Sequence, residues 1–229
     1  VTVIIDKTPI EVTTFRTEGD YNDARRPENV TFVTDINKDL SRRDFTVNAI
    51  AYNPETGFVD PFYGMEDIKR KTLRAVGNPQ KRFSEDALRI MRLFRFASVL
   101  GFTIEEDTKN AAINCADALQ KISVERIYTE LKKLCIGKYI HLAKPLFESG
   151  ALEFLGFNSF EKTELIKEFS NNDLKLFSLI FFCSKDTEKT LLLLKASNKT
   201  KDYFKLLSFC LANEPYTKAE IKSVRVFLR

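Results

Sequence analysis

The sequence predicts an α+β protein, in which a small part that mixes strands and helices is followed by an all-α part. β-Branched residues dominate the runs at 1–5 and 10–15, and such residues favour strands. From residue 84 onward, apolar residues recur at the helical spacing i, i+3, i+4 and i+7. At 229 residues, 44% of them hydrophobic and 30% charged, the chain is long enough to bury a sizeable core.

The front part is predicted to open with a hairpin, because residues 6–9 separate the two β-branched runs. A chain that opens inside a sheet suggests that an earlier part of the domain precedes it. Residues 17–37 are polar, contain Gly19 and Pro27, and are predicted to form mostly a long loop. Loops of this length are more often functional than average.

The next elements are predicted from caps and turns. Asp39 or Ser41 would cap a helix that runs to about Ala51. Short strands around 51–52 and 58–59 flank a turn, and residues 60–64 then mark a boundary.

The all-α part is predicted to begin with a helix whose N-cap is Ser84 and which ends at Gly101. Gly, Asn, Pro or Ser breaks separate the later helices. These are expected at about 105–119, 123–136, 139–149, 161–170, 173–183, 186–195, 200–212 and 217–228.

The composition excludes some kinds of site but does not by itself indicate a function. The net charge of +4 says little by itself, but the basic excess begins after residue 35, where the motifs begin. Four cysteines without a C-x-x-C pair and a single histidine, His141, indicate neither a zinc site nor a disulfide framework. Isolated thiols fit a reducing cytoplasm, and no apolar stretch is long enough to span a membrane.

The first motif is S-E-D-A-L-R-I-M-R at 84–92. It is typical of a helix start, with an i,i+4 pair between Glu85 and Arg89. A second interpretation is that Asp86 and Arg89, on one helix face, offer an acceptor and a planar donor fork to the Watson–Crick edge of a base. Phosphate binding would explain the positive charge nearby, which comes from Lys81, Arg82, Arg92 and Arg95.

The second motif is R-R-D-F-T-V-N-A at 42–49. It fits an amphipathic helix start with solvated charges. It also fits a nucleotide grip, in which Arg43 contacts phosphates, Asp44 accepts from a ribose hydroxyl and Asn48 lies one helical turn further on. Glu11, within a strand, is either an exposed strand position or a Mg²⁺ ligand, because Mg²⁺ takes oxygen donors.

Four segments, E-V-T-T-F-R (11–16), R-R-D-F-T-V-N-A, D-P-F-Y-G-M-E-D-I (60–68) and S-E-D-A-L-R-I-M-R, occur together and in order. In this the chain resembles the class II tRNA nucleotidyltransferases (CCA-adding enzymes) and related bacterial poly(A) polymerases of the polymerase-β superfamily. The resemblance is specific over about residues 1–130 and weak over the helical remainder.

The resemblance implies a role for each matched residue. Arg43, Asp44 and Asn48 would bind ribose and triphosphate. Glu85, Asp86 and Arg89 match the base-reading motif, in which Asp86 and Arg89 would pair with the base of CTP and then ATP. Glu11 would be a third carboxylate beside the metal pair. Asp60, Pro61, Phe62 and Gly64 match a hinge-like segment. The polar stretch 17–34, with Arg16, Asp23, Arg25 and Arg26 in or beside it, matches a flexible loop that assists the switch to adenosine addition.

The chain departs from the family at its catalytic element. A Gly-Gly-x-x-x-Arg-Asp loop and an Asp-x-Asp strand precede the hairpin in the family, and no Asp-x-Asp occurs in these 229 residues. A two-metal reaction needs those carboxylates. The chain alone is therefore expected to bind nucleotide poorly and to catalyse nothing, as a piece of a longer enzyme would.

The resemblance implies three parts: the C-terminal part of a nucleotidyltransferase head (1–80), a helical neck with the base-reading motif (81–138) and a helical body (139–229). The expected activity is addition of CCA to tRNA with Mg²⁺, the tRNA acceptor arm being held mostly by phosphate contacts. Rivals are a poly(A) polymerase, an enzyme that adds only CC or only A, and a non-catalytic RNA-binding helical module. The oligomeric state is left open.

Overall fold

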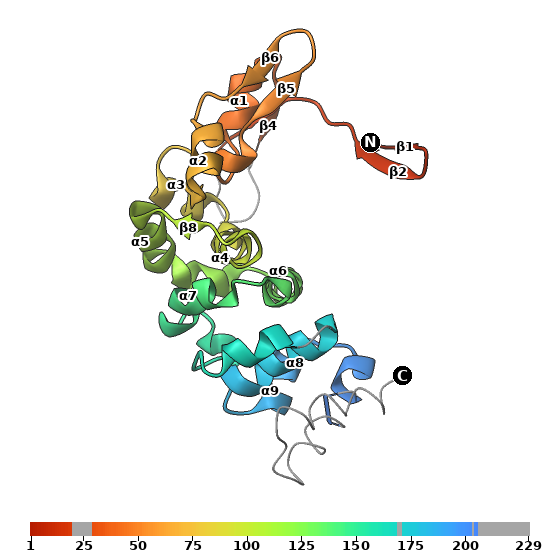
Figure 1. The fold of residues 1–229 in the computed structure, drawn as a ribbon, viewed down its shortest axis with the longest axis vertical. Coiled ribbons are helices and arrows are strands. Elements are labelled where there is room, and N and C mark those ends of the chain that lie inside the picture. The colour runs from red at the N-terminus through yellow and green to blue at the C-terminus, as the bar shows by residue number, and fades with distance from the viewer. Residues whose placement is uncertain (20–28, 169–170, 203, 206–229) are drawn as a thin grey trace.

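The computed structural model describes residues 1–19, 29–168, 171–202 and 204–205. Figure 1 shows an elongated arrangement, with the strands that precede residue 60 toward one end and the helices following one another toward the other end. The α+β class is confirmed, with strands in front and helices behind.

The strands pair two by two. Three pairs are antiparallel and β7–β8 is parallel. In chain order the pairs are β1 (Thr2–Ile5) with β2 (Thr8–Glu11), β3 (Arg16–Glu18) with β4 (Val30–Phe32), β5 (Ala51–Asn53) with β6 (Gly57–Val59), and β7 (Thr72–Leu73) with β8 (Thr103–Ile104).

The predicted first hairpin and the strand pair around residues 51–59 are confirmed. The loop predicted over 17–37 is wrong at both ends. Arg16 lies opposite Phe32 in a third hairpin, and a helix begins at Ile36. The middle of that stretch, residues 20–28, lies outside the described residues. The β-forming residues on each side are separated by too long a polar segment for a turn signal to join them.

The helices account for most of the rest. The α-helices are α1 (Ile36–Ser41), α2 (Gly64–Arg70), α3 (Pro79–Glu85), α4 (Leu88–Leu100), α5 (Glu106–Asn114), α6 (Val124–Ile136), α7 (Lys144–Glu148), α8 (Asn172–Cys183) and α9 (Thr187–Leu193). The 3₁₀ turns are η1 (Thr46–Asn48), η2 (Ala116–Lys121), η3 (Ile140–Ala143), η4 (Glu153–Leu155) and η5 (Thr163–Glu168).

The helices predicted at 123–136, 173–183 and 186–195 are confirmed. Those at 105–119 and 139–149 are present but divided between α-helix and 3₁₀ turn, and the one at 161–170 is a 3₁₀ turn as far as it is described. Residues 198–202 and 204–205 are helical. The remainder of the last two predicted helices lies outside the described residues.

The helix predicted from Asp39 or Ser41 to Ala51 is wrong. Asp35 is the N-cap of α1, because its side chain accepts from the Asn37 amide at 2.9 Å. α1 ends at Ser41, and Phe45 then forms a β-bridge with Ala75. The Phe45 side chain is fully buried, so the chain leaves the helical path where that ring enters the core.

The helix predicted to begin at Ser84 is also wrong at its start. Asn78 caps α3, which begins at Pro79, and the Ser84 hydroxyl donates to the Lys81 carbonyl within that helix. Asp86 is extended (φ −141°, ψ 102°), and its carboxylate accepts from the Leu88 amide at the start of α4. The predicted end is confirmed, since Gly101 is the C-cap with φ 71°.

α4 is the central element of the core. Its buried residues include Ile90, Met91 and Phe94, and α6 packs along it. Gly137, just beyond α6, lies so close to Ser98 of α4 that a Cβ there would overlap the Ser98 hydroxyl and carbonyl. The Ser98 hydroxyl also donates to the Leu134 carbonyl at 2.8 Å. The two helices are therefore fixed at close range.

Two expectations from composition concern the isolated cysteines and the possibility of a membrane-spanning helix. Cys135 and Cys183 are buried, and burial raises the pKa of each thiol to about 12, so they pack as small apolar groups. Within the described ranges, no helix is both long and apolar enough to cross a membrane.

The contact at Gly137 gives a stability prediction. Gly137→Ala forces Ser98 or α6 to move, and overpacking of this kind costs about 1–3 kcal/mol. The melting temperature of the 229-residue chain, measured by circular dichroism, is expected to fall by about 2–4 °C for each kcal/mol. Gly19→Ala is the control, because the nearest atom to its Cβ would lie at 3.4 Å. Equal melting temperatures for the two variants would contradict the close packing.

Candidate nucleotide-binding site

The two sequence motifs meet where the segment after α1 lies against α4. The Arg92 guanidinium binds the Asp44 carboxylate, with Nε and Nη2 at 2.7 and 2.6 Å from Oδ2. The other oxygen of Asp44 accepts from the Phe45 amide at 2.9 Å and from the Asn48 side chain at 3.1 Å. Asp44 is 8% exposed. The structure thus brings together three of the predicted nucleotide-binding residues: Asp44, Asn48 and Arg92.

The spacing predicted that Asp44 and Asn48 lie on one helix, and this prediction is wrong. Asp44 precedes η1, and Asn48 is the last residue of that turn. Both oxygens of Asp44 already accept bonds from the chain. A ribose hydroxyl would therefore replace one of these donors or share an oxygen with it.

Arg43 is the exposed member of this motif, and its Nη2 lies 3.2 Å from Asp39 Oδ2. The side chain is 41% exposed, so it can turn toward a phosphate. Asp39, by contrast, is buried. The sequence predicted it only as a possible helix N-cap and missed this burial. Burial raises the pKa of its carboxyl, but hydrogen bonds from Arg42, the Arg16 amide and Arg43 outweigh that effect and leave the pKa below its ordinary value.

Arg89 is held by contacts from two separate segments. Its Nη1 donates to Glu85 Oε2 at 2.7 Å and to the Arg82 carbonyl at 3.0 Å. Its Nη2 donates to the Arg42 carbonyl at 3.0 Å. The Glu85–Arg89 pair predicted from the spacing is confirmed, although the helix is interrupted between them. Of the five N–H donors of a guanidinium, the chain uses three here.

Asp86 faces a different partner. Its Oδ2 lies 3.3 Å from Nη2 of Arg126 in α6, a residue that sequence reasoning missed. Nη1 of Arg126 is buried and has no hydrogen-bond partner among the residues that the structure describes. The helix dipole makes a positive charge unfavourable in the first turn of a helix. The position of Arg126 in the first turn of α6 was therefore the one sign in the sequence that it has a special partner. Because Asp86 is extended, the prediction that it shares a helical face with Arg89 is wrong.

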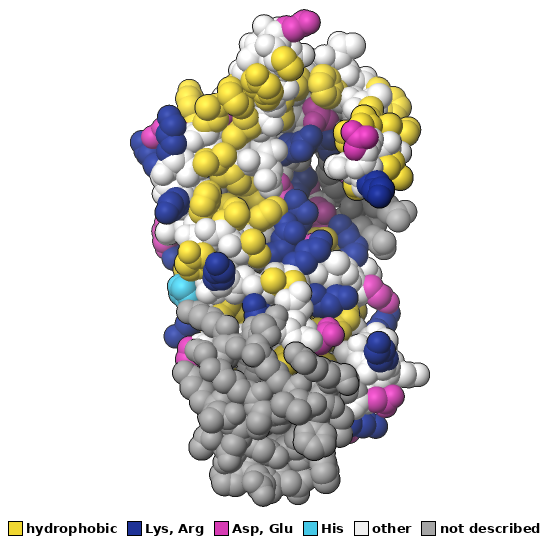
Figure 2. Space-filling model, turned by 45° about the vertical axis from the view of Figure 1, so that its right-hand side comes forward, with side chains coloured by type: hydrophobic (Ala, Val, Ile, Leu, Met, Phe, Trp, Pro, Cys, Tyr) yellow, Lys and Arg dark blue, Asp and Glu magenta, His cyan; other side chains and the backbone are white. Residues whose placement is uncertain are grey.

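Further arginines continue the positive charge along α4. Arg95 lies 3.0 Å from Glu130 Oε2, and its guanidinium stacks 4.0 Å from the centre of the Phe96 ring. Figure 2 shows Lys and Arg side chains gathered in the middle of one face, beside a stripe of hydrophobic side chains. Such a surface suits phosphates.

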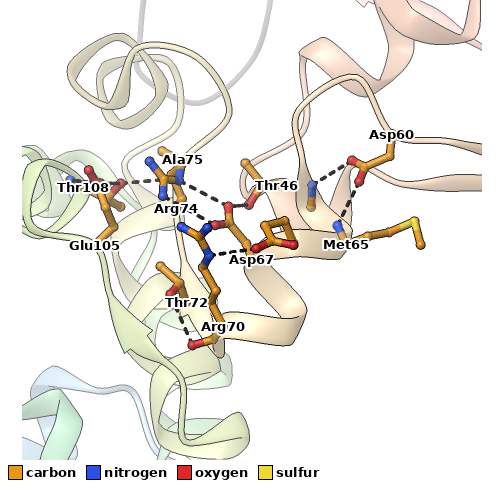
Figure 3. A network of polar contacts seen from close by, with 12 residues as sticks. Thr46, Asp60, Met65, Asp67, Arg70, Thr72, Arg74, Ala75, Glu105 and Thr108 are labelled. Atoms are coloured by element: carbon orange, nitrogen blue, oxygen red, sulfur yellow. Dashed lines mark hydrogen bonds and ion pairs between the residues drawn. The ribbon is translucent and has the colours of Figure 1, made fainter.

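The segment from Asp60 to Arg74 is held by the carboxylates of Asp60 and Asp67, of which Asp67 is buried (Figure 3). Asp67 accepts from the Thr46 hydroxyl at 2.7 Å and from Arg74 at 3.2 Å. The Asp60 carboxylate accepts from the amides of Gly64 and Met65 at 2.7 and 2.9 Å, and so caps α2. These contacts fix the path of the segment matched to a hinge, whose motion stays a prediction.

The remaining predicted residues lie elsewhere. Glu11 is exposed at the end of β2, in a hairpin that Figure 1 shows projecting from the rest of the front part. No group of three or more His, Cys, Asp or Glu residues that could hold a metal occurs within the described ranges. Arg16 lies in β3, whereas Asp23, Arg25 and Arg26 fall outside the described residues.

Comparison with known proteins places this geometry in a family. Residues 1–74 match the model described as the poly A polymerase head domain. Residues 101–157 match the one described as the probable RNA and SrmB-binding site of polymerase A. The CCA-adding enzyme of Streptococcus gordonii is 49% identical over 156 residues, which are 68% of this chain and 39% of that enzyme.

Solved structures agree with this result. The Bacillus stearothermophilus CCA-adding enzyme in complex with CTP superposes with a TM-score of 0.76 at 33% identity, over 94% of this chain and 54% of that one. A tRNA nucleotidyltransferase complexed with a primer tRNA and an ATP analog shares the fold, with a TM-score of 0.67 at 24% identity, over 90% of this chain and 69% of that one.

The chain spans about two fifths of the length of the curated relatives it matches. Within that span the four motifs, the strands in front and the helices behind correspond to one family. The chain belongs to the class II tRNA nucleotidyltransferases and bacterial poly(A) polymerases.

Proposed function

We propose that this chain carries the nucleotide-reading part of an enzyme that adds CCA to the 3′ end of tRNA. One observation carries the proposal. The motifs at 42–49 and 84–92 are in direct contact through Arg92 with Asp44 and through Arg89 with the Arg42 carbonyl. The relatives named as CCA-adding enzymes, one of them in complex with CTP, support the same activity.

The base would be read by Asp86 and Arg89. Cytosine and adenine each present an amino donor next to a ring-nitrogen acceptor, whereas uracil and guanine present the reverse order. A carboxylate acceptor and a guanidinium donor that both reach this edge of the base therefore suit CTP and ATP. In support, two N–H groups of Arg89 remain beyond its three contacts with the chain, and those three contacts together hold the guanidinium in place.

Arg43 and Arg92 would hold the triphosphate, and Asp44 and Asn48 the sugar. In the reaction, the 3′ oxygen of tRNA forms a bond to the α-phosphorus of the nucleotide. The bond from that phosphorus to the bridging oxygen breaks, and pyrophosphate leaves. Fixed positive charge near that oxygen stabilises the leaving group.

Mg²⁺ belongs to this proposal for the whole protein, because such ions neutralise the charge of a leaving pyrophosphate. Glu11 is its candidate ligand in this chain. The described residues alone do not fit a two-metal centre, because they bring no three acidic, His or Cys side chains together.

The tRNA acceptor arm is the proposed partner, and its phosphates would lie along the positively charged face in Figure 2. The division into head (1–80), neck (81–138) and body (139–229) is part of the same proposal. Supporting it, the strands β1 to β7 all precede residue 80, and α4 with α6 forms the centre of the middle part.

A chimera tests the activity. The 156 matched residues of the Streptococcus gordonii enzyme are replaced by those of this chain, and nucleotide incorporation is followed on a tRNA transcript that lacks CCA. We expect addition of two C residues and one A, because the chimera joins this chain's nucleotide grip to the rest of a working enzyme.

Other products would select a rival. Long A tails without use of CTP indicate a poly(A) polymerase, and addition of CC alone or A alone indicates a partial enzyme. If the intact Streptococcus gordonii enzyme is active and a folded chimera incorporates nothing, the non-catalytic RNA-binding module is favoured.

Arg89→Ala tests the base-reading role. The variant is expected to disturb the choice among CTP, ATP, UTP and GTP in the chimera far more than it changes tRNA affinity, measured by filter binding. Arg70→Ala is the control, because Arg70 is exposed and paired at i,i+4 with Glu66 at 2.9 Å. Equal loss of selection and of tRNA affinity in Arg89→Ala would count against the role.

A further inference from the structure

Asp39 is a buried carboxylate that gathers donors from three residues. It is 3% exposed. Its Oδ1 accepts from the Arg16 amide at 3.2 Å and from Arg42 Nε at 3.0 Å, and its Oδ2 accepts from Arg43 Nη2 at 3.2 Å. The opposing effects of burial and hydrogen bonding leave its pKa below the ordinary value, so the carboxylate is charged at neutral pH.

Arg42 connects this carboxylate to the base-reading arginine. Its side chain is fixed by Asp39, and its Nε also donates to the Arg16 carbonyl at 3.0 Å. Its main-chain carbonyl accepts from Arg89 Nη2 at 3.0 Å. A shift of the Arg42 backbone would therefore move an acceptor that orients the Arg89 guanidinium.

The other two acceptors of Arg89 do not replace the Arg42 carbonyl. Glu85 and the Arg82 carbonyl both take Nη1, so they restrain one corner of the planar group. The Arg42 carbonyl restrains Nη2 from a segment 47 positions earlier in the chain. Acceptors from different segments on both Nη1 and Nη2 hold the direction of the guanidinium more firmly than the contacts of Nη1 alone.

We propose that Asp39 is a positioning residue for nucleotide selection, which fixes the Arg42 backbone and through it the direction of the Arg89 guanidinium. The proposal deepens the proposed function and rests on it. The same carboxylate also holds the backbone of β3, because it accepts from the Arg16 amide. β3 begins the segment that matches the flexible loop. A loosened guanidinium could meet the carbonyl oxygens of uracil or guanine, so discrimination would fall.

Asp67 offers a matched control. It is 4% exposed and accepts from an arginine and a hydroxyl, so Asp67→Asn removes a comparable buried charge. Its partners are Thr46 and Arg74, whereas Arg89 donates to Arg82, Glu85 and Arg42. A purely structural loss would therefore appear in both Asp39→Asn and Asp67→Asn, while a positioning effect would appear only in the first.

The first readout is the Arg89 guanidinium itself, observed by ¹⁵N NMR in the 229-residue chain. Asp39→Asn is expected to speed exchange of its Nη protons with water by about tenfold or more, the size expected for loss of one charge-assisted hydrogen bond. Asp67→Asn should leave that rate unchanged. An unchanged rate in folded Asp39→Asn, or the same rise in both variants, overturns the proposal.

If Asp39→Asn does not fold, Arg42→Lys replaces it, because this change keeps the charge and the carbonyl but loses the Nε donor that binds Asp39. The same rise in exchange at Arg89 is expected, and an unchanged rate again overturns the proposal.

The second readout is binding of CTP and UTP to the same chain, by NMR titration. The preference for CTP over UTP should fall by about tenfold in Asp39→Asn and stay unchanged in Asp67→Asn. An unchanged preference in Asp39→Asn contradicts the selection role. If the unsubstituted chain shows no preference, the proposed function fails instead, and the Arg89 exchange rates still decide whether Asp39 positions that side chain.

Discussion

The contact between Arg92 and Asp44 joins two segments that are 48 positions apart, and the rest of the site depends on it. Removing one partner of a buried ion pair leaves an uncompensated charge, which costs about 3–5 kcal/mol when burial is complete. The Arg92 side chain is 35% exposed, so the cost here is smaller because solvent screens it. The contact fixes Asp44, and Asp44 in turn fixes Asn48 and the turn that follows.

The arginines of this region are restrained rather than free. Arg82 and Arg89 share Glu85, Arg95 pairs with Glu130, and Arg126 faces Asp86. Ion pairs of this kind contribute little net stability, because desolvation offsets their attraction. What they provide is a fixed orientation of donors and acceptors, which selection among bases requires, since a misplaced group accepts the wrong partner as readily as the right one.

Local patterns in the sequence were enough to predict the first hairpin, the strands around residues 51–59, α6 and the end of α4 at Gly101. The Glu85–Arg89 pair also followed from spacing, because it depends on neighbours in the chain. The break at Asp86 did not follow, since a carboxylate that caps the next helix looks in sequence like one in a first turn.

Other features depend on contacts between distant segments. Phe45 leaves the helical path because it is buried beside Ala75, and the buried Asp39 accepts from the Arg16 amide, 23 positions earlier in the chain. Arg126 joins the site only through the packing of α6 on α4. Single residues of these types carry no signal of such contacts, so periodicity could not predict them.

The central claim is that both motifs bind one nucleotide as a single site. It is tested most directly by titrating the 229-residue chain with CTP and following its backbone amide resonances by NMR. We expect the signals of Arg43 and Asp44 to shift together with those of Asp86 and Arg89, along one binding curve in the millimolar range. Shifts confined to one motif, two different curves, or no shift in either motif would contradict it.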